Sequence, residues 1–165
     1  MPIYVIRHGL SEANNRNNIG TLAFAAKDAP LMDLGKEQAR DRGMILSSEF
    51  GIDVANTPIA TSELLRTQET AREMGFQILR PYALLNEVEH DMEGSALRTM
   101  LDDGELPAAA LRTAEAILAQ PPQEGVWVTH GLVIAGLSHV LGVSGQFERL
   151  IPRFCEVREL PIGLE

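Results

Sequence analysis

The sequence predicts an α/β fold with a mostly parallel sheet. Short apolar runs alternate along the chain with longer segments in which apolar residues recur at helical spacing. This alternation is typical of parallel sheets that are covered by helices. The chain has 165 residues, of which 45% are hydrophobic. Length and composition therefore predict a single domain, residues 1–165, whose core needs no disulfide to be stable.

Four apolar runs are expected to form the parallel part of the sheet. They cover residues 2–7, 57–61, 76–80 and 125–129. A fifth run, near 154–160, alternates only in part between apolar and polar residues. That pattern favours an antiparallel strand at one edge.

The first two predicted helices follow the first two strands. The first begins with Asp33, a good N-cap residue, and ends near Ser48. The second opens at Ser62 and carries Glu63 in its first turn, where a negative charge suits the helix dipole.

Two further helices are predicted in the second half of the chain. One covers about 107–119 and stops at a pair of prolines, and the other covers about 131–141 and stops at Gly142. Residues 14–30 and 86–106 are expected to be irregular. Both stretches should lie over the carboxyl edge of the sheet, where open α/β folds bind ligands.

The motif Arg7-His8-Gly9 directly follows the first apolar run. A histidine between an arginine and a glycine suits a nucleophile that faces a phosphate better than it suits a core. The arginine offers a planar fork of donors to phosphate oxygens. The glycine allows a sharp turn and a close approach to a ligand. A buried structural histidine is the alternative, and the motifs described next count against it.

Two more motifs follow later strands. Thr61-Ser62 with Arg66 comes after the second run, and His130-Gly131 comes after the fourth. Two arginines and two histidines from three strand ends can surround one phosphate. For Arg66 alone, the ordinary alternative is a position on a helix surface.

With these motifs the chain resembles the histidine phosphatase superfamily, which includes phosphoglycerate mutases and small phosphatases. The resemblance extends from residue 3 to about 140 and implies a three-layer α/β/α sandwich. The matching residues are Arg7, His8 and Gly9 with Ser11 and Asn14, then Leu31, Gly35, Gln38 and Ala39, then Thr61, Ser62 and Arg66, and finally His130 and Gly131.

The expected activity is that of a metal-independent phosphomonoester phosphatase that acts through a phosphohistidine on His8. A neutral histidine nitrogen attacks phosphorus, which splits one difficult displacement into two easier ones. Positive groups stabilise the transferring phosphoryl group, so no metal or other cofactor is expected. The phosphate is expected to contact Arg7, Asn14, Arg66, His130 and Gly131, although Asn14 could equally well cap its own loop.

The resemblance also implies an acidic proton donor in the loop at 85–94. Glu87 matches the Leu-x-Glu opening of the family pattern, but Glu93-Gly94 lies one residue closer than usual. The donor is therefore either Glu87, which we favour, or Glu89. The cluster Glu87, Glu89, His90, Asp91 and Glu93 has no spacing typical of metal ligands, so a solvated acidic loop is favoured over a metal site.

Hydrolysis is favoured over phosphoryl transfer. Mutases of the superfamily carry Glu or Gln directly after Arg-His-Gly, where this chain has Leu10, and they are longer. The expected substrate is a phosphorylated small molecule or a phosphoprotein. Two alternatives stay open: mutase-type transfer, and a non-catalytic phosphate-binding module. The second would be expected to have lost His8, an arginine or every acid in the donor loop.

The charge and the cysteine content limit the partners and the compartment. A formal net charge of −9 argues against binding to nucleic acids or to anionic membranes. Cys155 is the only cysteine, so no internal disulfide forms, and a buried position is expected for it. No apolar run reaches the roughly 20 residues of a membrane span and no secretory signal is visible. We therefore expect a cytoplasmic protein.

Overall fold

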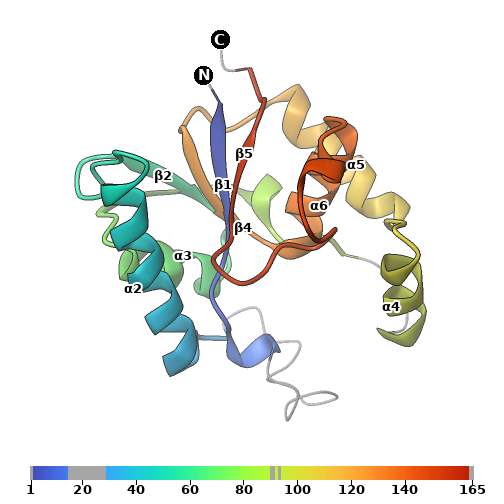
Figure 1. The fold of residues 1–165 in the computed structure, drawn as a ribbon, viewed down its shortest axis with the longest axis horizontal. Coiled ribbons are helices and arrows are strands. Elements are labelled where there is room, and N and C mark those ends of the chain that lie inside the picture. Colours follow the sequence, from blue (N-terminus) through green and yellow to red (C-terminus); the bar gives the residue numbers. More distant parts are fainter. Residues whose placement is uncertain (1, 15–28, 90–91, 93, 164–165) are drawn as a thin grey trace.

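The computed structural model describes residues 2–14, 29–89, 92 and 94–163. In this part of the chain five strands form one sheet in the order β3-β2-β4-β1-β5 (Figure 1). All neighbouring strands are parallel except β5, which runs antiparallel to β1 at the edge. The predicted sheet is confirmed. Its strands are β1 (Ile3–Arg7), β2 (Pro58–Thr61), β3 (Ile78–Pro81), β4 (Val126–Thr129) and β5 (Val157–Leu160).

Helices cover both faces of the sheet, so the predicted three-layer α/β/α sandwich is also confirmed (Figure 1). One face carries α2 (Asp33–Ser48) and α3 (Leu65–Glu73), and the other carries α5 (Ala108–Ala119) and α6 (Gly131–Val140). Nowhere in the described ranges is a helix both long enough and apolar enough to cross a membrane.

Each face has its own hydrophobic core because neighbouring side chains of a strand point to opposite sides. In β1, Val5 packs in the cluster under α5 and α6, whereas Ile6 packs in the cluster under α2 and α3. In β4, Trp127 lies on the first side and Val128 on the second. A strand covered on both faces is expected to be apolar throughout, and β4 is buried along its whole length.

Several predicted boundaries are wrong, each for a local reason. β3 starts at Ile78 because Phe76 still donates its backbone N–H to Ala71 and so belongs to the end of α3. β5 starts at Val157 because Cys155 has a φ of 58°, which interrupts an extended strand. The N-cap of α2 is Met32, and Asp33 is the first helical residue.

The second predicted helix does not open at Ser62. α3 begins at Leu65, with Leu64 as its N-cap. The Ser62 hydroxyl accepts a hydrogen bond from the Leu64 N–H at 3.1 Å, which forms a local turn instead of a helical one. Glu63 donates its backbone N–H to the Asn86 side chain at 2.8 Å and lies outside the helix.

The region 86–106, predicted to be irregular, contains a helix. This helix, α4 (Gly94–Asp102), has 9 residues, none of them fully buried. Leu97, Met100 and Leu101 recur at helical spacing, but the pattern is shorter than the stretch over which periodicity identifies a helix. The other predicted irregular stretch, 14–30, lies mostly outside the described residues. Three short 3-10 helices complete the described structure: η1 (Glu12–Asn14), η3 (Ala83–Leu85) and η4 (Ser144–Gln146).

Replacing Gly43 by alanine is expected to destabilise the fold by about 1–3 kcal/mol, the usual cost of overpacking. A β-carbon on Gly43 would overlap the backbone carbonyl of Met74, just after α3. Backbone cannot move aside as a flexible side chain can. The measurement is the urea midpoint of unfolding, with Met44→Ala as the control because Met44 is 71% exposed on the same helix. A Gly43→Ala protein as stable as the Met44→Ala protein would contradict this packing.

Candidate active site

Three neighbouring parallel strands end at one edge of the sheet and deliver three polar side chains there. His8 follows β1, Ser62 follows β2 and His130 follows β4, and all three residues are buried. The rings of His8 and His130 lie 5.1 Å apart between centroids at an angle of 63°. The structure therefore brings the two histidine motifs together, although they are distant in sequence.

The hydrogen bonding of His8 fixes its tautomer. Its Nδ1 lies 2.7 Å from the backbone oxygen of Gly9. A carbonyl can only accept, so Nδ1 carries the proton and Nε2 carries the free electron pair. Burial lowers the pKa of His8 well below its ordinary value, and the charges of Arg7 and Arg66 lower it further. His8 is therefore neutral near pH 7 and has an available nitrogen.

His130 is held by one nitrogen and leaves the other without a partner. Its Nε2 lies 2.9 Å from Ser62 Oγ, and Ser62 Oγ lies 2.8 Å from Thr67 Oγ1. The Nδ1 atom is buried and has no hydrogen-bond partner in the described structure. Burial lowers the pKa of His130, as do His8, Arg66 and Arg7. No sequence pattern indicated that Ser62 orients His130. The position of Ser62 in the Thr61-Ser62 motif was the one available signal.

Arg7 and Arg66 place two buried N–H groups without acceptors near the histidines. The Nε atoms of both arginines are buried and unpaired within the described residues. The Arg7 guanidinium donates to Pro152 O at 2.7 Å and lies 4.1 Å from the centroid of the Phe154 ring. Burial lowers the pKa of Arg7 to about 10, so it keeps its charge at neutral pH. Unpaired buried donors of this kind suit an anionic ligand.

The two glycines of the motifs serve close packing. Gly9 does not have a positive φ, so the chain makes no left-handed turn at this residue. Its missing β-carbon would lie 2.6 Å from Gly35 O in the first turn of α2, so protein backbone makes the close approach. A β-carbon on Gly131, the first residue of α6, would lie 3.3 Å from Arg7 Nε. Gly131 thus makes room for the Arg7 guanidinium.

Glu87 lies in a loop that is fastened at several points. Asn86 and Glu63 exchange two hydrogen bonds of 2.8 and 2.9 Å, and Thr129 Oγ1 donates to Leu85 O at 2.6 Å. Leu85 itself is fully buried. The donor loop is thereby tied to the ends of both β2 and β4.

The two candidate proton donors have different surroundings. Burial raises the pKa of Glu87, against the opposing effects of the Val88 backbone N–H and of the charges of Arg7 and Arg66. Glu89 is exposed. Glu87 is thus close enough to both arginines for their charges to act on it, and its raised pKa suits a group that must hold a proton.

The remaining candidates are placed as follows. Asn14 Oδ1 accepts from Ser11 Oγ at 2.7 Å, which is the contact of a loop cap. Cys155 is buried as expected, and burial raises the pKa of its thiol to about 12.

Part of the acidic cluster lies outside the described residues, namely His90, Asp91 and Glu93. In the parts of the chain that the structure covers, no group of three or more His, Cys, Asp or Glu side chains is arranged to hold a metal ion.

Comparisons with known proteins identify the family and the fold. The histidine phosphatase superfamily (branch 1) matches residues 3–91. No curated protein sequence matches the chain significantly. Among solved structures, TTHB049 of Thermus thermophilus is 21% identical, with a TM-score of 0.63 over 97% of this chain and 99% of that one. Rv3214 of Mycobacterium tuberculosis is 18% identical, with a TM-score of 0.61 over 94% and 88%.

A third similar structure carries a functional name. It is a candidate alpha-ribazole-5'-P phosphatase of Escherichia coli strain K-12, and it is 22% identical. The TM-score is 0.57 over 100% of this chain and 99% of that one. At these identities the three likenesses establish the shared fold.

Proposed function

Because the chain belongs to the histidine phosphatase superfamily (branch 1), we propose that it is a phosphatase that hydrolyses a phosphomonoester through a phosphohistidine on His8. The observation that carries the proposal is the state of His8. It is neutral, its Nδ1 is bonded to Gly9 O, and its Nε2 is free beside two arginines. The name of the Escherichia coli neighbour, a candidate phosphatase, supports the same class of reaction.

In the first step, His8 Nε2 forms a bond to phosphorus and the bond from phosphorus to the ester oxygen breaks. The leaving alkoxide takes the proton of Glu87. Arg7, Arg66 and the unpartnered Nδ1 of His130 bind the phosphoryl oxygens, with the proton of His130 on Nδ1 while Ser62 Oγ donates to Nε2. Backbone N–H groups at the start of α6 add to this anion site.

In the second step, water attacks the phosphohistidine. The Glu87 carboxylate takes a proton from the water, the bond from nitrogen to phosphorus breaks, and inorganic phosphate leaves. His8 recovers its free electron pair and Glu87 recovers its proton. The substrate is a phosphorylated small molecule or a phosphoprotein. Leu10 after the first motif makes the mouth of the site less polar, which favours hydrolysis over retention of an intermediate for transfer.

Hydrolysis of 4-nitrophenyl phosphate is expected to persist in excess chelator and to be inhibited by vanadate. The arginines supply the positive charge that a metal would otherwise supply. Vanadate binds as an analogue of the five-coordinate phosphorus, so it should occupy the same groups. The assay compares steady-state rates with and without chelator, beside a zinc-dependent phosphatase as the control. Loss of activity in chelator that a divalent metal restores would refute the metal-independent route.

A further inference from the structure

A cavity of about 510 Å³ lies between α4 and the segment that follows η4. Leu97 and Leu101 line it from the helix, and Leu150 and Ile151 line it from the segment. The volume is in the range of about 300–1,000 Å³ found for small-molecule sites.

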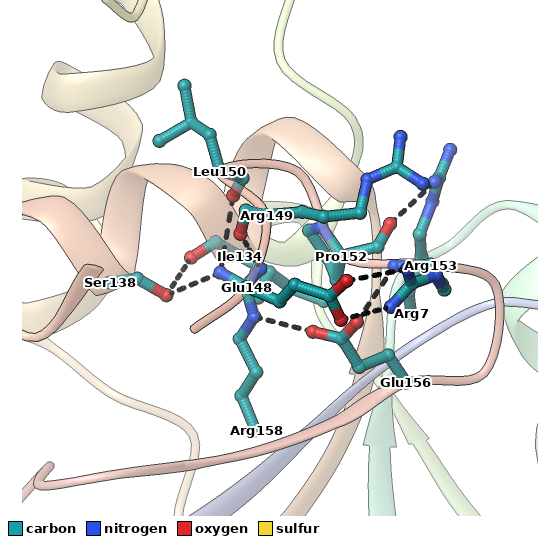
Figure 2. Close-up of polar contacts among 10 residues, drawn as sticks. All are labelled: Arg7, Ile134, Ser138, Glu148, Arg149, Leu150, Pro152, Arg153, Glu156 and Arg158. Atoms are coloured by element: carbon teal, nitrogen blue, oxygen red, sulfur yellow. Dashed lines mark hydrogen bonds and ion pairs between the residues drawn. The ribbon is translucent and has the colours of Figure 1, made fainter. Parts of the chain in front are cut away.

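This cavity adjoins the candidate phosphate site. Ile151, which lines the cavity, contacts the start of α6, since a β-carbon on Gly131 would lie 3.0 Å from Ile151 Cγ2. Arg149 lines the same cavity, and its charge contributes to the lowered pKa of Arg7. Figure 2 shows the guanidinium groups of Arg149 and Arg7 next to each other. The segment that contains Arg149 and Ile151 therefore lies between the cavity and the candidate phosphate site.

Two arginines of the cavity lie outside the ion pairs that the described residues form. Arg98 and Arg149 both line it, and among the described residues neither forms an ion pair. By contrast, Arg153 on the same segment pairs with Glu148 at 2.9 Å. The chain has 23 acidic and 14 basic residues, so two basic side chains at one cavity contrast with the overall negative charge. One acid, Asp102, lines the cavity too, so the described lining residues carry an excess of one positive charge.

The wall that carries Arg149 is held by a buried arginine (Figure 2). Arg158 is 1% exposed. It donates to Arg149 O at 2.6 Å and to Leu150 O at 3.2 Å. Its other bonds go to Ser138 Oγ at 3.1 Å and to Glu156 at 2.9 Å. Because Arg158 binds the backbone oxygens of Arg149 and Leu150, the backbone that carries Arg149 is held in place before a ligand binds.

We propose that this cavity binds the leaving group of the substrate, and that the leaving group is a small apolar chain or ring with a second anionic group. The carboxylate or phosphate of that group pairs with Arg149 and Arg98, which offer planar forks of donors. The leucines and Ile151 cover the apolar part. The proposal rests on the proposed phosphatase function and specifies the class of substrate.

The test compares three esters of one chain length: a simple alkyl phosphate, the same ester with a terminal carboxylate, and the same ester with a terminal phosphate. We expect kcat/KM to be roughly tenfold to a hundredfold higher for at least one charged ester, as charged hydrogen bonds imply. The better of the two charged esters identifies the anionic group. Arg149→Gln and Arg98→Gln should each reduce this advantage about tenfold.

Arg153→Gln is the matched control, because it removes a positive charge from the same segment outside the cavity, and it should keep the advantage. Equal kcat/KM for charged and uncharged esters would overturn the proposal. So would equal effects of Arg149→Gln and Arg153→Gln, or a phosphopeptide that is hydrolysed better than every small ester.

A binding experiment separates this proposal from the proposed function. Calorimetry with the His8→Asn protein measures the affinity for the same three intact esters. Suppose that the wild type hydrolyses no ester, that the charged esters bind to the His8→Asn protein more tightly than the simple ester, and that the His8→Asn, Arg149→Gln double variant loses this difference. The cavity then binds the anionic group as proposed, and the phosphatase proposal fails. If an aryl phosphate is hydrolysed but the three esters bind equally, the reverse is true.

Discussion

Replacing His8 by asparagine is expected to abolish the covalent intermediate and to lower kcat by on the order of ten-thousandfold, as is typical for loss of a nucleophile. Asparagine can still donate to Gly9 O from its side-chain amide, so the local fold should survive. It has no nitrogen with a free electron pair to attack phosphorus. The measurement is a single-turnover reaction with an ester whose phosphoryl group is radioactive. The label on the wild-type protein should be labile in acid and stable in base.

His130→Asn is the matched control for this experiment, because it makes the same change on the neighbouring ring 5.1 Å away. It should slow the reaction by removing one contact to the phosphoryl oxygens, and it should still show the label on His8. Equal labelling of the wild type and the His8→Asn protein would remove His8 from the role of nucleophile. A label that is lost only in the His130→Asn protein would make His130 the nucleophile and His8 the residue that contacts the phosphoryl oxygens.

Glu87→Gln is expected to slow hydrolysis of an alkyl phosphate on the order of a hundredfold or more, and that of 4-nitrophenyl phosphate only a few-fold. General acid catalysis contributes most when the leaving group is a poor one. Glu89→Gln is the control, since Glu89 is exposed in the same loop, and it should affect neither ester much. The measurement is kcat/KM for both esters in all three proteins.

The pH profile gives a second measurement of the same role. An acid acts while it is protonated, so kcat/KM for the alkyl ester should fall as pH rises through the pKa of Glu87. Burial raises that pKa above its ordinary value, so the fall should occur above the pH at which an exposed glutamate titrates. A leaving-group-dependent loss in Glu89→Gln alone would move the donor to Glu89. No such loss in either variant would place the donor elsewhere, or indicate a natural leaving group that needs no proton.

The sheet and the histidine site could be predicted because their determinants are local. Buried strands such as β4 (Val126–Thr129) are apolar up to their last residue, and the residue directly after such a strand must lie at the sheet edge. His8 and His130 are placed by that rule alone. The convergence of Arg7 and Arg66 with them follows from the parallel order of the strands.

Other parts of the site depend on contacts that no local pattern carries. Pro152 bonds to Arg7 across 145 residues of sequence, and this contact exists only because β5 returns beside β1. Arg149 likewise lies near Arg7 only because the chain returns to β1. Its neighbours in sequence are exposed or half-buried, so no local pattern marks it. The predicted start of α3 was wrong because serine is a common N-cap residue, whereas the Ser62 hydroxyl is hydrogen-bonded to the Leu64 N–H and to His130 Nε2.

The position of β1 in the sheet has a consequence for the order in which the protein acquires its site. β1 is synthesised before the other strands of this sheet, yet its partners are β4 and β5. Domains begin to fold as they leave the ribosome, N-terminal parts first, but here β1 must wait for both. Its long-range pairing also implies slow folding. Until Val157 and the residues after it have emerged, Arg7 and His8 have no complete sheet to hold them. A ribosome-bound chain that ends before β5 should therefore have no organised phosphate site, however much of α2 and α3 has formed.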